Sequence, residues 1–294
     1  MTVFLLVVMN MLAKLLSDTQ EVVAILFYRN IVAVACIFSY IVIKKRFDLL
    51  KTKKPKLHLK RSISGNIGVF LVFTAFSMLP MADMTSLMLA APLIATLLAS
   101  VLLKEIVTWQ RLIIILFGFL GVLVIIKPTG DVMLEGTLVA FVAVFFLAWI
   151  NVQLRELGRT EEPLTTVFYF LLAGTIITSI FMPFVYKPVE GIEFLLLAGL
   201  IIVVILSQVL KTEAMRHASV AVLTPLSYTG IVWATLFGWI IWGDFPDWTI
   251  WLGTAIIISS SIISLRIKDQ SLNFADSLDS GTHKISPRNS DESA

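Results

Sequence analysis

The chain has few groups that could carry out catalysis. Charged residues make up only 15% of its 294 residues, and the three histidines, His58, His217 and His283, all lie outside the apolar stretches. The single cysteine, Cys36, allows neither an intrachain disulfide nor a cysteine-based metal site. There is no Gly-rich phosphate-binding loop, which excludes ATP hydrolysis by this chain. We expect no metal ion, no cofactor and no catalytic residue.

Apolar residues take the place of the missing polar ones. They make up 58% of the chain, and the mean hydropathy is +0.92. Apolar runs recur from Val3 to Leu265, and each is long enough to cross a hydrocarbon core about 30 Å thick. Because backbone amides in lipid must be satisfied within the segment, these runs predict helices rather than isolated strands. The expected fold is an all-α polytopic membrane protein.

Hydropathy predicts ten transmembrane helices, at residues 3–17, 22–43, 62–80, 84–103, 109–126, 133–154, 164–186, 192–212, 218–242 and 248–266. When the connections are assigned alternately to two sides, the side of the N-terminus receives nine Lys and Arg residues between Lys44 and Arg61, and eight more later in the chain. The other side receives only Lys127 and Lys187. The positive-inside rule therefore predicts that both termini are cytoplasmic. Residues 269–294, polar and aperiodic, are expected to form a disordered cytoplasmic tail.

Similar residues recur at a nearly constant offset. Asn10 and Lys14 have counterparts in Asn151 and Arg155, 141 positions later, and Phe27-Tyr28 matches Phe168-Tyr169 at the same offset. A repeating unit of five helices contains an odd number of spans, so its second copy must enter the membrane from the opposite face. The sequence thus predicts two inverted five-helix repeats, residues 1–128 and 129–268, an organisation typical of transporters.

Longer motifs in both halves resemble a known family. The matching segments of the first half are Leu79-Pro80-Met81-Ala82-Asp83, Ala91-Pro92-Leu93, Leu103-Lys104-Glu105, Trp109-Gln110-Arg111, Gly118-Phe119-Leu120-Gly121-Val122 and Lys127-Pro128. Those of the second half are Thr224-Pro225-Leu226-Ser227-Tyr228-Thr229-Gly230 and Trp242-Gly243-Asp244-Phe245-Pro246-Asp247. They are similar to the EamA repeat of the drug/metabolite transporter superfamily.

The resemblance implies a ten-helix secondary transporter of the bacterial inner (cytoplasmic) membrane that works by alternating access. Trp109-Gln110-Arg111 is most similar to the S-adenosylmethionine uptake type, so the leading substrate is S-adenosylmethionine or another nucleoside-like or amino-acid-like metabolite. Riboflavin and amino-acid carriers of the same superfamily are the alternatives, because a shared fold does not determine the substrate. We expect the partners to be a small molecule and the lipid bilayer, and no nucleic acid.

Two cations stand out because they lie away from the cytoplasmic ends of the predicted spans. A charge at the bilayer centre costs about 2.5–3.5 kcal/mol on insertion scales, so each is a candidate functional group. Lys14 and Arg29 are candidates for binding an anionic group of the substrate. Alternatively, Lys14 extends to the outer headgroups or pairs with Asp18. For Arg29 the alternative is a salt bridge or contacts to carbonyls that lock the two halves together.

Polar and aromatic residues of the spans complete the predicted site. The substrate-binding candidates are Asn10, Lys14, Arg29, Asn66, Trp149, Asn151, Gln208, Tyr228 and Trp233. Ordinary hydrogen bonds between helices are the alternative for each, at about 1 kcal/mol or less. Pro92 and Pro225 are predicted to interrupt helices as gating points, the alternative being tolerated kinks.

The sequence disfavours two alternatives, an intramembrane enzyme and a channel or lipid flippase. An intramembrane enzyme would need paired acids, a His/Glu metal cluster or an activated serine, and the spans contain none of these. A channel or a lipid flippase is disfavoured because inverted repeats suit alternating access. The spans also contain no carboxylate near mid-membrane, which favours exchange or facilitated movement over a buried proton relay.

Overall fold

The computed structural model describes residues 1–102, 109–126, 134–158, 160–217, 226–263 and 266. These residues form helices and connections and no strand, so an all-helical fold is confirmed for the part of the chain that is described. Each of the ten predicted spans has a helical counterpart there.

The helices follow one another along the chain with short connections. Their bounds are α1 Thr2–Ser17, α2 Val22–Ile43, the 3-10 turn η1 Phe47–Leu50, α3 Pro55–Met78, α4 Met81–Met88, α5 Ala91–Leu102, α6 Trp109–Ile126, α7 Leu134–Leu157, α8 Pro163–Val185, α9 Ile192–His217, α11 Thr229–Phe237 with the π-helix η2 Gly238–Trp242, and a last helix Trp248–Ile263. Four of them contain segments long and apolar enough to cross a bilayer by length and composition: Val22–Ile43, Leu134–Leu154, Pro163–Val185 and Ile192–Ala214.

The third helix begins earlier than hydropathy predicted. It starts at Pro55 rather than at residue 62, with the proline in its first turn, where a missing N–H costs no helical bond. Its first turns carry the exposed Lys56 and Lys60, and these lower the local hydropathy. His58, expected outside the spans, is therefore a buried residue of α3.

The fourth predicted span consists of two helices. α4 ends at Met88 and α5 begins at Ala91. The interruption lies directly before Pro92, which is the second residue of α5, a position where proline is well tolerated. Its role as a gating point stays a prediction. The amides of Leu93 and Ile94 both donate to the Ala90 carbonyl, at 3.0 and 3.2 Å. Pro225 lies outside the described residues.

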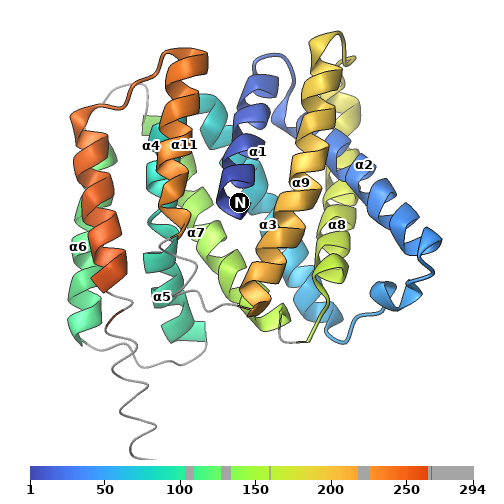
Figure 1. The fold of residues 1–294 in the computed structure, drawn as a ribbon, viewed down its shortest axis with the longest axis horizontal. Coiled ribbons are helices and arrows are strands. Elements are labelled where there is room, and N and C mark those ends of the chain that lie inside the picture. The colour runs from blue at the N-terminus through green and yellow to red at the C-terminus, as the bar shows by residue number, and fades with distance from the viewer. Residues whose placement is uncertain (103–108, 127–133, 159, 218–225, 264–265, 267–294) are drawn as a thin grey trace, which may run out of the picture.

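The helices pack as one bundle (Figure 1). α1 packs on α9, α2 on α8 and α3 on α7, while α11 packs on α1 and α4. In Figure 1, α4, α5 and α6 lie on one side of the bundle and α2 and α8 on the other. The α1–α2 and α8–α9 connections lie at its upper end, and the α2–α3 and α7–α8 connections at its lower end.

α6 crosses the last helix at a pair of glycines. A Cβ added to Gly121 would lie 2.7 Å from the carbonyl oxygen of Gly253, and one added to Gly253 would lie 2.6 Å from the carbonyl oxygen of Gly121. The two backbones are therefore in direct contact, which small residues permit at helix interfaces in membranes.

Polar contacts join the first and second halves of the chain at the upper end of the bundle. Gln20 donates through Nε2 to the Pro188 carbonyl at 3.1 Å and to Glu193 Oε2 at 2.9 Å. Lys187 Nζ lies 3.6 Å from Glu21 Oε1. These contacts connect the turn between α1 and α2 with the turn between α8 and α9.

A buried carboxylate makes the corresponding connection at the lower end. Glu161 Oε1 accepts hydrogen bonds from the Thr52 hydroxyl at 3.1 Å and from the Lys53 amide at 2.9 Å. Its Oε2 lies 3.7 Å from Nε2 of the buried His58. The connection before α3 is thereby held to the connection between α7 and α8.

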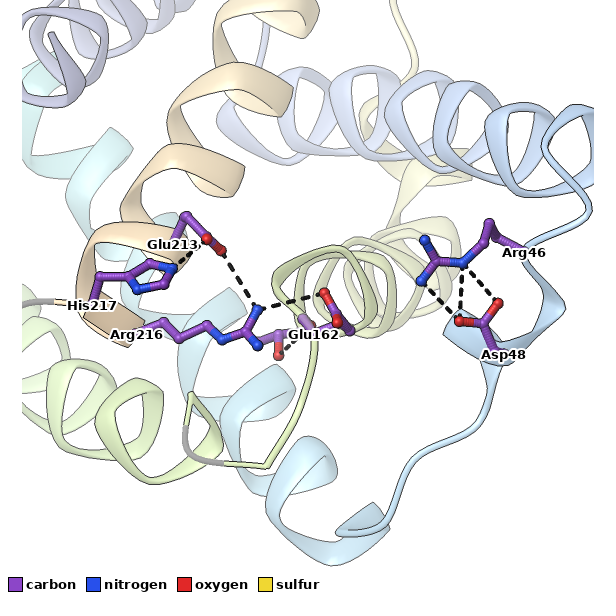
Figure 2. Close-up of polar contacts among 7 residues, drawn as sticks. Arg46, Asp48, Glu162, Glu213, Arg216 and His217 are labelled. Atoms are coloured by element: carbon purple, nitrogen blue, oxygen red, sulfur yellow. Dashed lines mark hydrogen bonds and ion pairs between the residues drawn. The ribbon is translucent and has the colours of Figure 1, made fainter.

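Exposed ion pairs surround this end of the bundle. Figure 2 shows Arg216 between Glu162 and Glu213, with N···O distances of 3.6 and 4.0 Å, and His217 at 2.7 Å from Glu213. The guanidinium of Arg46 donates to Asp48 at 2.8 Å in the same view and lowers the pKa of that carboxyl. Exposed pairs of this kind contribute at most about 1 kcal/mol each.

Candidate substrate-binding site

Arg29 is fully buried within the bundle. Its Nε donates to Asn30 Oδ1 at 3.1 Å, and its guanidinium carbon lies 5.1 Å from the centroid of the Phe73 ring on α3. Both terminal nitrogens, Nη1 and Nη2, have no hydrogen-bond partner in the described part of the chain. Among the described residues no carboxylate pairs with Arg29, so the salt bridge proposed as its alternative role is not found there.

Two asparagine side chains, Asn30 and Asn66, meet at Gly174 where α2, α3 and α8 pack together, and Asn30 contacts Arg29. A Cβ at Gly174 of α8 would collide with Asn30 Nδ2 and with Asn66 Oδ1, so the glycine makes room for both amides. Asn66 Nδ2 donates to the carbonyls of Ser62 and Phe170 at 2.8 and 3.0 Å. Asn30 Nδ2, in contrast, has no partner within the described residues. Arg29 and Asn30 therefore present three unpaired nitrogen donors.

Two further cations lie on α3 and α9. Arg61 is 4% exposed, and its guanidinium carbon lies 4.6 Å from the centroid of the Phe170 ring. Its Nε and Nη1 have no hydrogen-bond partner among the described residues. Lys211 of α9 is partly buried and close enough to Arg61 for the two charges to repel each other.

Sequence reasoning missed Arg61 and Lys211 as site residues. Both were counted as charges of cytoplasmic connections, because hydropathy placed them near helix ends. Both residues lie on turns of α3 and α9 that continue beyond the apolar part of each helix. The signal in the sequence is that a helix can continue past its apolar run, and the length of that continuation is seen only in the structure. An unpaired buried donor costs about 1–3 kcal/mol, and an unpaired buried charge costs more. These cations are therefore candidates for contact with a ligand.

The amides predicted on α1, α7 and α9 lie inside the bundle. Asn10 and Gln208 are 4% and 6% exposed, and Asn151 is partly buried. Oδ1 of Asn10 and Oδ1 of Asn151 lack partners in the described residues. Gln208 lies one helical turn before Lys211, so the two share a face of α9. None of these amides forms a hydrogen bond with Arg29 among the described residues, and their role in binding stays a prediction.

The predicted aromatic residues have other neighbours. Trp233 is 37% exposed, and its ring meets Phe4 edge to face at a centroid distance of 4.9 Å. Trp149 packs near the exposed Phe145, at 6.1 Å between centroids. Tyr228 is partly buried beside Ser261 of the last helix. The structure does not bring these three residues together with Arg29 in the described part of the chain.

Lys14 has a role that neither interpretation of the sequence anticipated. Its Nζ donates to the carbonyls of Phe76 and Leu79 at 3.0 and 2.6 Å and lies 5.3 Å from the centroid of the Trp242 ring. The side chain thus points inward to the end of α3, and neither extends to the headgroups nor forms an ion pair with Asp18. A cation at the free carbonyls of a helix C-terminus is stabilised by their partial negative charge. Lys14 accordingly fastens α1 to α3.

Comparisons with known proteins agree with this arrangement. The EamA-like transporter family matches residues 1–127 and again residues 134–266. The chain is 28% identical over 270 residues to the pseudopaline exporter of Pseudomonas aeruginosa strain PAO1, covering 89% of this chain and 92% of the exporter. It is also 28% identical over 231 residues to a riboflavin transporter of Vibrio cholerae, covering 78% of each.

A third relative is an S-adenosylmethionine uptake transporter of Rickettsia prowazekii, 22% identical over 266 residues that cover 90% of each chain. A solved crystal structure with 18% sequence identity superposes with a TM-score of 0.62 over 92% of this chain and 97% of that chain, which shows a shared fold. The resemblance seen in the sequence motifs is confirmed, and with it the expectation that the chain is a transporter rather than an enzyme. Two matches that together cover most of its length show that the chain belongs to the EamA-like transporter family.

Proposed function

We propose that the protein is a secondary transporter that moves a small polar metabolite across the bacterial inner membrane by alternating access. The observation that carries the proposal is a group of buried donors on Arg29, Asn30 and Arg61 that have no hydrogen-bond partner among the described residues. Polar groups are expensive in a membrane interior, and in transporters they mark the substrate pathway. Named relatives that transport three different metabolites support the class of function.

The packing of the helices supports an inverted repeat. If residues 1–128 and 129–268 are equivalent halves, then α1, α2 and α3 correspond to α7, α8 and α9, and α4 with α5 corresponds to α11. In such an arrangement each contact between the halves has a counterpart. The contact of α1 with α9 corresponds to that of α7 with α3, and the contact of α3 with α8 corresponds to that of α9 with α2. The contact of α1 with α11 corresponds to contacts of α7 with α4 and α5. Each of these contacts occurs. A pseudo-two-fold arrangement lets a central site open to one face and then to the other.

The substrate we favour carries an amino-acid-like head group, as S-adenosylmethionine does. Its carboxylate can accept the unpaired donors of Arg29, because guanidinium groups bind carboxylates through paired hydrogen bonds. Riboflavin is the second candidate, and its flat ring would have to stack on an aromatic side chain. Trp149, Trp233 and Tyr228 have no contact with Arg29 among the described residues. The ring that does lie beside it, Phe73, is already covered by the guanidinium at 5.1 Å, so the cluster favours the head group over the ring.

Uptake into proteoliposomes tests this function. S-adenosylmethionine, riboflavin and an aromatic amino acid would be offered singly, with and without a pH gradient. We expect saturable uptake of at least one compound with a carboxylate, competed by its unlabelled form. No pH gradient should be required, because the described spans contain no carboxylate near mid-membrane to relay a proton. If no compound enters faster than it enters protein-free vesicles, the substrate classes named here are wrong.

Labelling of single cysteines tests the inverted repeat. After replacement of Cys36 by serine, Lys51→Cys in the connection before α3 and Glu190→Cys in the connection before α9 are equivalent positions of the two halves, and both are exposed. We expect a membrane-impermeant maleimide added to intact cells to label Glu190→Cys only, and permeabilisation to expose Lys51→Cys. Labelling of both positions from outside would exclude the inverted topology.

A further inference from the structure

We propose that Arg61 and Lys211 bind an anionic group of the transported molecule, so that the substrate carries a carboxylate or a phosphate. The inference rests on the proposed transport function and names the substrate class. It adds a site on α3 and α9 to the candidate site around Arg29. One residue comes from each half of the chain, so the anion would lie between the two halves.

The position of the pair suits a site reached from one face of the membrane. Arg61 lies six residues after the start of α3, and Lys211 lies six residues before the end of α9. At 1.5 Å per residue, both are about 9 Å from the lower end of their helices. The lower end is also where the positive-inside rule predicts the cytoplasm.

The Arg61 side chain points toward the membrane interior. A Cβ at Gly65, one turn further into the helix, would collide with Arg61 Nη1. Helical side chains usually lean toward the N-terminus, which for Arg61 would mean toward the lower surface. An arginine that avoided the hydrocarbon would extend the same way to reach the headgroups. The opposite orientation, against the Phe170 ring, holds the guanidinium inside the bundle.

No anion of the described residues compensates these charges. The nearby carboxylates are already paired, Glu161 with His58 and Glu213 with Arg216 and His217. Lys211 instead lies in the repulsive field of Arg61. Two neighbouring cations without a counter-charge destabilise the empty protein, and a bound anion would remove the repulsion. Gln208 and Thr212 flank Lys211 on α9 and offer further polar contacts.

Thermal unfolding of the purified protein in detergent tests the site, with citrate as the probe. Sodium citrate would be compared with sodium chloride at equal ionic strength, so that simple screening is the same in both. We expect citrate to raise the apparent melting temperature of the wild type, because a ligand that binds only the folded state stabilises it. Arg61→Gln and Lys211→Gln should each lose this shift.

Stability without citrate separates binding from a structural role. If Arg61 serves binding, Arg61→Gln should melt at the same or a higher temperature than wild type in chloride, because an unpaired buried charge has been removed. If Arg61 holds the fold together, the variant melts lower and the inference is overturned. Arg61→Lys should retain part of the citrate shift. Lys60→Gln removes a charge from the exposed neighbour on α3 and should retain all of it.

Two further outcomes count against the inference in different ways. If citrate has no effect and mixed micelles with phosphatidylglycerol stabilise the wild type instead, the pair binds a lipid headgroup and the substrate class is wrong. If Arg61→Gln transports a compound that carries a carboxylate or a phosphate at the wild-type rate, the anion site is wrong while the transport function stands. A citrate shift in a protein that transports none of the tested compounds would support the site and count against the proposed function.

Discussion

Replacing Arg29 with alanine should reduce substrate uptake about 100-fold while the protein still inserts into the membrane. Hydrogen bonds to a charged group contribute about 1.5–3 kcal/mol, so losing the contacts of two guanidinium nitrogens removes roughly 3 kcal/mol of binding. The loss should fall on transport rather than on folding, because Nη1 and Nη2 have no partner in the described protein. Initial uptake rates in proteoliposomes, normalised to reconstituted protein, measure the effect.

Controls for Arg29 are available in the same chain. Arg46→Ala removes an exposed cation that pairs only with the neighbouring Asp48 among the described residues, and it should leave uptake unchanged. Asn10→Ala, in the predicted site but apart from Arg29, should also abolish uptake. Wild-type uptake in both Arg29→Ala and Asn10→Ala would show that the substrate binds elsewhere.

A single methyl group at Gly253 should destabilise the folded protein by about 1–3 kcal/mol, the usual cost of overpacking a core. The Cβ of Gly253→Ala would meet the Gly121 carbonyl oxygen at 2.6 Å and Ile125 Cγ1 at 2.5 Å. A backbone oxygen cannot rotate away, so α6 and the last helix would have to separate. Unfolding in mixed micelles, followed by helical circular dichroism, measures the loss.

The matched substitution at Gly199 should have the opposite sign. Its Cβ would meet only Leu12 Cδ1, at 3.6 Å, an ordinary van der Waals contact. Alanine is favoured over glycine in a helix by about 0.5–1 kcal/mol, so Gly199→Ala should stabilise the protein by up to that amount. Equal effects at Gly199 and Gly253 would contradict the close crossing of the two backbones.

Much of the architecture is predictable from the sequence because the bilayer imposes it. Backbone groups cannot remain unpaired in hydrocarbon, so long apolar runs must be helical, and their number and order follow from hydropathy. The boundaries were less accurate, as the start of α3 shows. The first turns of α3 carry Lys56 and Lys60, so hydropathy does not include them in the span. The helix nevertheless includes them, because backbone hydrogen bonding between residues four apart does not depend on whether the side chains are apolar.

The candidate site was only partly predictable. Arg29 and Asn66 were identified because polar groups in an apolar run are costly and stand out. Trp149 and Trp233 were proposed on residue type alone, and the structure turns them toward Phe145 and Phe4 instead. Arg61 is not predicted as a site residue, because the sequence does not distinguish a cation near a helix end from a charge in a connection.

The sequence by itself determined that the chain is a helical membrane protein and which transporter family it resembles, and each span it predicts has a helical counterpart among the described residues. These properties depend on the chemistry of successive residues and on the solvent around them. Only the tertiary structure decided which polar groups have partners. Lys14 is satisfied by the carbonyls at the end of α3, whereas Arg29 and Arg61 keep donors without a partner in the described part of the chain. That difference depends on the direction of each side chain and on the helix that faces it, and residues distant in the sequence determine both.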